Sequence, residues 1–230
     1  MNKKRIFVIL ICIISAIVVL VSATATYAIW QQNVHDSIYI KIPVEDENPS
    51  VKYQMFVPVK ASGNTVSNTN SAYTRVSGSY TITNDKYSYS LTDETEISNI
   101  VGYAFVGWFG GVSLEYIEIP SEYTMELNGE MVTKPVVRAM VDKDFEDYVL
   151  LGDRILTKII IGANVVEIDS GTFSGMQELR EIVYKGEENS EEIYIKEMAF
   201  GYCIKLENVE NHRNISENCD TTLIYMGSYA

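Results

Sequence analysis

The sequence predicts a mainly β protein, in which an N-terminal antiparallel, strand-rich part precedes a short solenoid of repeated coils with parallel strands. In the first half of the chain, apolar residues alternate with polar ones, as they do in half-buried strands. In the second half, leucines recur at Leu156, Leu179 and Leu206 with an apolar residue three positions after each, which indicates stacked units. The 230 residues are 47% hydrophobic, which is enough to bury a core.

Residues 1–28 have the pattern of an export signal. The basic residues 3–5 precede an apolar run over residues 6–21, and a small-residue exit ends at Ala25. This order is typical of a secretory signal peptide, so we expect cleavage after Ala25, with Ala28 as the alternative position. An uncleaved N-terminal membrane anchor is the other interpretation. Both place the rest of the chain outside the cell or on its surface, in contact with the membrane only through this segment.

Residues 29–96 are predicted to be the strand-rich region. Period two over residues 38–42 and 51–59 predicts half-buried strands, and Pro58, which lacks an N–H, favours an edge position for the second. Residues 80–91 alternate on both sides of a polar Asn-Asp pair and predict a β-hairpin. Residues 61–72 have no apolar period, so we expect a flexible loop or linker there.

Residues 97–211 hold the repeat. The residues three positions after the leucines are Ile159, Ile182 and Val209, and two phenylalanines, Phe173 and Phe200, each precede a leucine by six residues. An earlier unit begins at Leu114, and Trp108 lies six residues before it, in the slot that Phe takes later. The predicted core of the repeat is Leu114, Ile117, Leu156, Ile159, Ile161, Ile168, Phe173, Leu179, Ile182, Phe200, Cys203 and Leu206.

The physical logic of the unit is that Leu-x-x-Ile-x-Ile places apolar side chains on one side of a short strand, while a small residue and Phe fill the interior of the coil. One coil cannot close a core, so the coils must stack and their strands pair in parallel. These residues resemble the BspA-like leucine-rich repeats of bacterial surface proteins, over about residues 100–211. Residues 156–178 match that unit closely, 179–205 match it with an insertion, and 114–120 match its strand. Thr172 and Met176 stand where the family has Ala and Cys.

An insertion is expected at about residues 121–155. Its Asn128-Gly129 pair predicts a tight hairpin turn, because both positions tolerate positive φ. Residues 136–141 are expected to form a strand, and residues 142–148 a short helix with Asp142 as N-cap. Residues 212–230 are predicted to be a C-terminal cap that covers the exposed coil end.

The sequence predicts no catalytic, cofactor-binding or metal-binding residues. The net charge of −13 argues against a nucleic-acid partner. The acidic group Asp142, Asp144, Glu146 and Asp147 lacks the glycine and distal glutamate of an EF-hand loop, and we expect a solvated helix start there. Cys203 takes the interior cysteine slot of the repeat and is expected to be a buried small hydrophobe. A disulfide between Cys203 and Cys219 is the alternative that an exported protein permits.

These observations favour an exported, non-catalytic protein that binds a protein or glycan at the cell surface, as in adhesion. This expectation follows from the family resemblance and from the general use of repeat coils as contact surfaces. The alternative is a structural subunit of an extracellular fibre or envelope layer, which would polymerise through an open strand edge. The third hypothesis, an enzyme, is the one that the sequence favours least.

Overall fold

The computed structural model describes residues 54–83, 86–108, 114–142, 155–186 and 191–228. The chain divides into two compact units, Met1–Tyr39 and Ile40–Ala230, and all described residues belong to the second. The predicted export signal with Ala25, the strand at 38–42, the Asn84-Asp85 turn and the acidic residues Asp144, Glu146 and Asp147 therefore lie outside the described residues.

The described chain is mainly β, which confirms the predicted fold class, and it contains one four-residue α-helix, α2 (Thr221–Ile224), and a 3-10 helix at Glu94–Asn99. The strands are β1 (Gln54–Ala61), β2 (Tyr73–Arg75), β3 (Gly78–Thr83), β4 (Lys86–Leu91), β5 (Ile100–Trp108), β6 (Tyr116–Ile119), β7 (Glu122–Leu127), β8 (Glu130–Ala139), β9 (Lys158–Ile161), β10 (Glu167–Ile168), β11 (Glu181–Tyr184), β12 (Tyr194–Ile195) and β13 (Asn208–Asn211).

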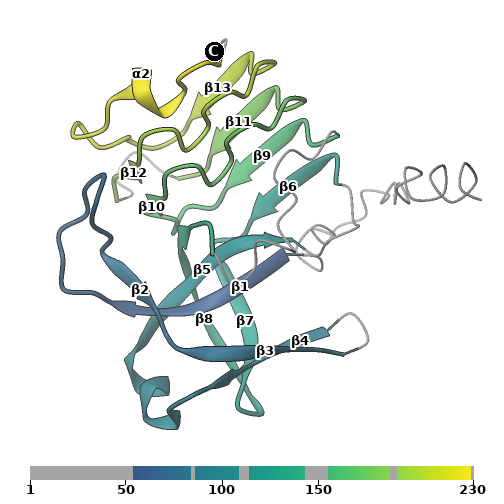
Figure 1. The fold of residues 1–230 in the computed structure, drawn as a ribbon, viewed down its shortest axis with the longest axis vertical. Helices are drawn as coiled ribbons and strands as arrows, with labels where there is room; N and C mark the ends of the chain where they lie inside the picture. Colours follow the sequence, from purple (N-terminus) through teal and green to yellow (C-terminus); the bar gives the residue numbers. More distant parts are fainter. Residues whose placement is uncertain (1–53, 84–85, 109–113, 143–154, 187–190, 229–230) are drawn as a thin grey trace, which may run out of the picture. The chain divides into compact units, whose positions relative to one another are not determined.

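The four strands that follow the leucines form a parallel sheet, the repeat sheet, in the order β13-β11-β9-β6 (Figure 1). Ile117, Ile159, Ile182 and Val209 are register partners in successive strands, so the offset seen in the sequence is a physical ladder. In β6 and β9 the buried side chains at these positions alternate with half-buried ones, so the ladder faces the coil interior.

The remaining strands form a nine-stranded mixed sheet with the path β2-β1-β5-β8-β7-β4-β3, to which β10 and β12 are added through β8. The predicted hairpin at residues 80–91 is present as β3–β4, with Tyr80 opposite Tyr89. The sheet is not purely antiparallel, since β5–β8 and β4–β7 pair in parallel.

Strand β1 differs from its prediction in two ways. Residues 54–59 are all buried, so half-burial is wrong: Phe56 stacks on Tyr123 of β7 at 4.1 Å between ring centroids, and Met55 and Val57 belong to the same core. β1 is also not an edge strand, because it lies between β5 and β2. Pro58 is tolerated because β2 pairs only with the three residues that follow it.

The loop at residues 61–72 is not a linker. It closes the β1–β2 hairpin with a bond from the N–H of Ser62 to the carbonyl of Ala72 (2.9 Å), and the Asn68 amide donates to the Glu197 carboxylate at 2.6 Å. Repeated serine and asparagine side chains bond the loop's own backbone, as at Ser62 and Ser67, which gives it a fixed course without apolar packing.

The insertion is a second hairpin, β7–β8. Asn128 and Gly129 form its turn with φ values of 49° and 88°, as their identities predict. Residues 100–108 and 122–139, which the sequence places in the repeat region, thus form the β5 strand and the β7–β8 hairpin of the mixed sheet. Asp142 differs from the expected solvated helix start: it is 5% exposed and paired with the Arg75 guanidinium at 2.7 Å.

An aromatic stack runs through the interior of the coils. Phe173 and Phe200 are stacked at 5.0 Å, Phe105 lies on the other side of Phe173 at 6.1 Å, and Tyr225 lies beyond Phe200 at 5.9 Å. The slot assigned to Trp108 is therefore taken by Phe105. Trp108 is buried beside Phe105, with 6.4 Å between their rings.

The coils are counted from Leu156, so the first coil is residues 156–178, the second is residues 179–205 and the third begins at Leu206. The C-terminal tail completes this third coil instead of lying across the coil end. Phe173 donates its N–H to Ala199, and Phe200 repeats this bond to Ile224 one coil later. The Cys203 thiol bonds the carbonyl of Phe173, and the Ser228 hydroxyl repeats this to Phe200. Ile224-Tyr225 thus takes the position of Ala199-Phe200, and Ser228 takes the position of Cys203. The sequence does not reveal this match because the residue types differ.

Candidate functional site

The twelve residues predicted as repeat core are each at most 3% exposed. They hold the coils together and offer nothing to a ligand. A functional site of the repeat has to be built from what the coils leave exposed, which directs attention to the turns and to the open side of the third coil.

The turns of the coils carry an exposed contact patch, defined here as Tyr202, Ile204 and Met226. Their exposed fractions are 54%, 41% and 42%. Tyr202 and Met226 are joined by a backbone hydrogen bond of 2.9 Å from the N–H of Tyr202, which places the two turns side by side. Exposed large apolar side chains in neighbouring positions are typical of contact surfaces.

Tyr202 has a backbone conformation that its side chain disfavours. Its φ is 58°, whereas the equivalent residues of the first and third coils are Gly175 and Gly227, with φ of 77° and 78°. Met198, at 61°, likewise takes the slot of Gly171. Left-handed geometry costs a non-glycine residue roughly 1–2 kcal/mol. The second coil therefore has Met198 and Tyr202 at two positions whose left-handed backbone is occupied by glycine in the equivalent turns.

The strand side of the third coil ends in β13, whose pairing within the described residues is with β11. The N–H of Asn208 donates to the carbonyl of Arg180, just before β11, and the N–H of His212 donates to the carbonyl of Tyr184 at the end of β11. Because backbone groups alternate in direction along a parallel strand, those of Val209 and Asn211 point away from β11. β13 is thus an edge strand of the described sheet, and its outward donors and acceptors have no partner among the residues that the structure describes.

A hollow of about 610 Å³ lies beside this edge. Val209, Ile215, Tyr225 and Met226 supply its apolar lining, and Asn211, Thr221, Thr222 and Ser228 its polar groups. Asn211 occupies the interior slot that Ile161 and Tyr184 fill in the preceding coils. Its short side chain leaves this space open.

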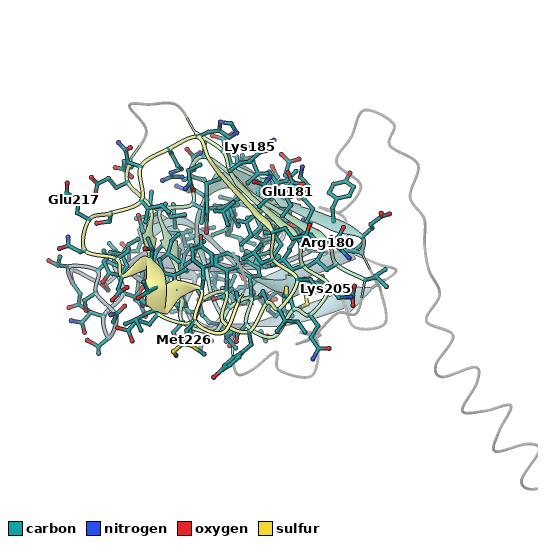
Figure 2. All side chains as sticks on the ribbon, turned by 90° about the horizontal axis from the view of Figure 1, so that it is seen from above. Arg180, Glu181, Lys185, Lys205, Glu217 and Met226 are labelled. Atoms are coloured by element: carbon teal, nitrogen blue, oxygen red, sulfur yellow. The ribbon has the colours of Figure 1, made fainter. Side chains whose placement is uncertain are left out.

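Charged side chains surround the end of the repeat. Figure 2 shows Arg180, Glu181 and Lys185 together on the strand side, Glu217 at the opposite margin, and Met226 beside α2. Glu207, Glu210, Glu217 and Asp220 are exposed acids of the third coil. Arg180 pairs with Glu207 at 3.0 Å, and His212 lies 3.7 Å from Glu210. The exposed charges of the third coil are therefore predominantly acidic.

The outer face of the repeat sheet carries ion pairs between strands. Lys158 pairs with Glu181 at 3.0 Å, and Lys185 pairs with Glu118. Tyrosines do not gather on this face among the described residues: Tyr116 of β6 is half-buried at an outward position, and Tyr184 of β11 is fully buried in the interior. An aromatic stacking surface for sugars is therefore not what this face provides.

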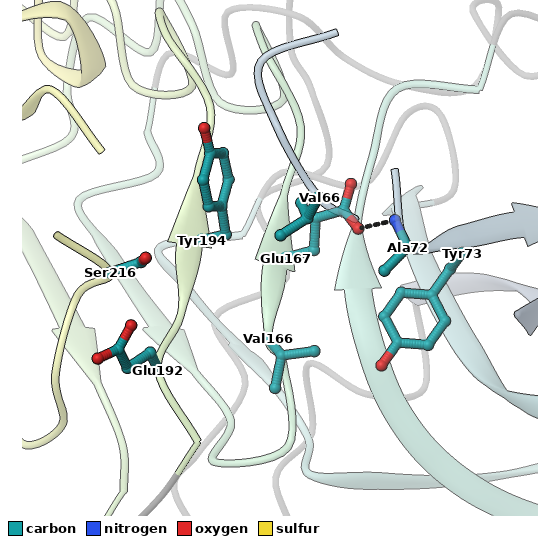
Figure 3. A pocket seen from close by; sticks show the side chains of 8 residues that line it. All are labelled: Val66, Ala72, Tyr73, Val166, Glu167, Glu192, Tyr194 and Ser216. Atoms are coloured by element: carbon teal, nitrogen blue, oxygen red, sulfur yellow. Dashed lines mark hydrogen bonds between the residues drawn. The ribbon is translucent and has the colours of Figure 1, made fainter. Parts of the chain in front are cut away.

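A second hollow, of about 200 Å³, lies between the loop at residues 61–72 and strands β10 and β12 (Figure 3). Figure 3 shows Glu167 in its wall with the carboxylate directed at the N–H of Ala72, at 3.1 Å, and Tyr194 on the neighbouring strand. Burial and the negative charges of Glu191 and Glu167 raise the pKa of Tyr73, which also lines the hollow.

A network of four charges lies beside this hollow, formed by the buried Arg138, Glu167 and Lys196 and the half-buried Asp169. Lys196 contacts Glu167 at 3.0 Å and Asp169 at 2.7 Å, and Arg138 pairs with the same two carboxylates. Arg138 also donates to the carbonyl of Tyr73 at 2.6 Å. Two positive and two negative charges are balanced here, so Glu167 is engaged in joining strands and not presented to a ligand.

Cys203 and Cys219 are free thiols, so the structure does not pair them. Burial raises the pKa of Cys203 to about 11, which keeps the thiol protonated and unreactive. Across the described ranges, His, Cys, Asp and Glu form no group of three that could hold a metal ion. Nor does any helix in these ranges have the length and apolar character to cross a membrane.

The fold and the exposed surfaces define a mainly β protein with a short leucine-repeat solenoid. No protein-family model matches the chain, and no curated protein matches it. One likeness is to a crystal structure described as a leucine rich cell surface protein from Faecalibacterium prausnitzii, with 19% identity and a TM-score of 0.34. It covers 63% of this chain and 32% of that one, so the chain spans about a third of that protein's length. Membership of the BspA-like family stays a sequence-based prediction.

Proposed function

We propose that the chain is an exported, non-catalytic protein of a bacterial cell surface that binds other proteins through the contact patch of Tyr202, Ile204 and Met226. The observation that carries this proposal is Tyr202, a large side chain held at positive φ and 54% exposed, at a slot where both neighbouring coils have glycine. Strained, exposed residues concentrate where function requires them. Tyrosine is also a residue type enriched among the strongest contributors to protein interfaces.

Two features of the sequence support the location and the type of activity. The pattern of residues 1–28 is typical of an export signal or anchor, and residues 156–205 resemble BspA-like repeats of bacterial surface proteins. The buried, protonated Cys203 is an unreactive thiol, and Glu167 is ion-paired with Lys196, so neither is presented as a nucleophile or base.

The alternative, a fibre subunit, requires one copy to pair with the next. Stacking β13 on β6 of a second copy would set Glu207 and Glu210 against Glu115 and Glu118. Like charges in directly opposed strands are destabilising. Charge therefore favours a monomer that binds a different protein.

The test uses the full chain with a fluorescent label and measures its binding to host epithelial cells and to bacterial cells by flow cytometry. Tyr202→Asn removes the ring but keeps a residue that tolerates positive φ, so we expect folding to persist and binding to fall at least about tenfold. Met198→Gly is the matched control, since it relieves the same kind of strain outside the patch and should bind as the wild type does. Unchanged binding by Tyr202→Asn, or elution of the wild type as long polymers, would contradict the proposal.

A further inference from the structure

We propose that the outer edge of β13 binds an extended, basic segment of a partner protein, which joins the repeat sheet as a further strand and places an apolar side chain in the 610 Å³ hollow. This inference deepens the proposed function and rests on it, because it names the class of protein that is bound. It concerns a different feature from the Tyr202 ring, so each can fail separately.

The backbone of β13 supplies the first argument. The outward N–H and C=O groups of Val209 and Asn211 have no hydrogen-bond partner among the described residues, and β13 pairs with β11 along all four of its positions. Such an edge is a template for strand addition by an extended peptide. Main-chain hydrogen bonds supply affinity in this mode, and side-chain pockets supply selectivity.

The hollow supplies the second argument. Side chains at Val209 and Asn211 face the coil interior, so alternate side chains of an added strand face the same way, over the hollow. Its volume lies within the range of about 300–1,000 Å³ that ligand pockets have. Ile215 and Tyr225 in the lining favour an apolar side chain there.

Charge decides between the possible occupants. The other side chains of an added strand lie on the outer face beside Glu210, and Glu217 and Asp220 add further negative charge to the third coil. A second copy pairing antiparallel through β13 would bring two such acidic edges together. A basic segment instead gains attraction along the same edge, so alternating basic and apolar residues fit both faces.

The experiment measures binding of fluorescein-labelled Lys-Val-Lys-Val-Lys-Val-Lys to the full chain by fluorescence anisotropy, with Glu-Val-Glu-Val-Glu-Val-Glu as the opposite-charge probe. We expect the basic peptide alone to bind, more weakly at high salt, and to protect the amides of Val209 and Asn211 from hydrogen exchange. Asn211→Pro removes one outward N–H without touching the bonds to β11 and should weaken binding at least about tenfold. Asn211→Ala is its matched control, because it keeps the N–H and should bind within about twofold of the wild type.

Glu210→Lys provides an independent test if the proline variant does not fold. It should weaken binding of the basic peptide and allow the acidic peptide to bind. Equal binding of both peptides, or full binding by Asn211→Pro and Glu210→Lys, would overturn the proposal. A wild-type dimer in light scattering that Asn211→Pro converts to a monomer would identify a second copy as the occupant instead. Loss of cell binding in Tyr202→Asn with intact peptide binding, or the reverse, shows which of the two proposals has failed.

Discussion

Arg213 is a buried guanidinium that joins separate turns of the repeat. It is 5% exposed and donates to the carbonyls of Ala163 (2.6 Å), Val165 (2.9 Å) and Glu191 (2.5 Å). Burial lowers its pKa, and the charge of Glu191 opposes that shift. A planar fork of donors can serve three carbonyls at once, which a lysine ammonium cannot do in the same geometry.

We therefore expect Arg213→Lys to lower the free energy of unfolding by about 2 kcal/mol, because buried carbonyls lose their donors. Urea denaturation followed by circular dichroism measures this. Arg180→Lys is the matched control: its ion pair with Glu207 is exposed, so the change should stay below about 0.5 kcal/mol. Similar losses for the two variants would show that the contacts of Arg213 do not stabilise the fold.

Asp220 is the N-cap of α2 and makes the third coil sensitive to acid. Its carboxylate accepts hydrogen bonds from the Thr222 hydroxyl (2.5 Å) and the Thr222 N–H (2.9 Å), and these bonds hold its pKa below the ordinary 3.8. A lowered folded-state pKa gives stability that is present above 3.8 and is lost as the pH falls through the folded value.

Below pH 4, we expect the urea concentration at the midpoint of unfolding to decrease more steeply with falling pH for the wild type than for Asp220→Asn. Asparagine caps a helix about as well as aspartate but does not titrate, so the difference between the two curves isolates this carboxyl group. If the midpoints of the two proteins decrease equally with pH below pH 4, the Asp220 carboxylate does not contribute to the acid sensitivity.

At the scale of elements, the network of Arg138, Glu167, Asp169 and Lys196 joins β8, β10 and β12. Arg138 and Glu167 are register partners in β8 and β10, and Glu167 is opposite Tyr194 of β12. Strands of two residues make few ladder bonds, so the charges help to fix which residues pair.

Removing one charge from this network should be costly. We expect Glu167→Gln to destabilise by about 3–5 kcal/mol, because Arg138 and Lys196 then share a single carboxylate in a buried site. Glu181→Gln, which breaks the half-exposed pair with Lys158, is the matched control and should cost less than about 1 kcal/mol. Thermal or urea unfolding compares the two, and equal losses would mean that the network is solvated in solution.

Elements with a strict local period were predictable, and those fixed by distant packing were not. The ladder of Ile117, Ile159 and Ile182 follows from spacing alone, and the β7–β8 turn follows from Asn128-Gly129. Neither the choice of Phe105 over Trp108 for the aromatic stack nor the burial of Asp142 by Arg75 leaves a local signal, because each depends on strands far apart in the chain.

The candidate site was largely beyond sequence reasoning for the same reason. Gly175, Tyr202 and Gly227 each lie two residues after a ring of the aromatic stack. Their equivalence is recognised only once Tyr225 is aligned with Phe200, which the structure shows and the residue types do not. The sequence alone predicts a cap after residue 211, since Tyr225 and Ser228 do not carry the residue types of the repeat. The open edge of β13 follows only when the third coil is seen to be complete.

For the whole molecule, β8 joins the mixed sheet to the repeat. Its second half pairs with β5 on one side, and Arg138 and Ala139 pair with β10 on the other, which continues to β12. One hydrophobic core cluster includes Phe56 and Met125 of the mixed sheet together with Ile159 and Phe200 of the repeat. The division at residues 96 and 97 predicted from the sequence therefore does not coincide with a break in packing.

This continuity predicts a single cooperative unfolding transition for the described part of the chain. Ile182→Ala in β11 creates a core cavity that costs about 2–5 kcal/mol, and a shared transition transmits that loss to every strand. Hydrogen exchange in increasing urea, read by mass spectrometry, should show the opening free energies of β1 and β5 falling as far as those of β9 and β11. Val101→Ala, at a 41% exposed position of β5, is the control and should leave both sets within about 0.5 kcal/mol. If Ile182→Ala weakens β9 and β11 while β1 and β5 keep their wild-type values, the sheet and the repeat are independent units, and the β8 junction carries no cooperativity.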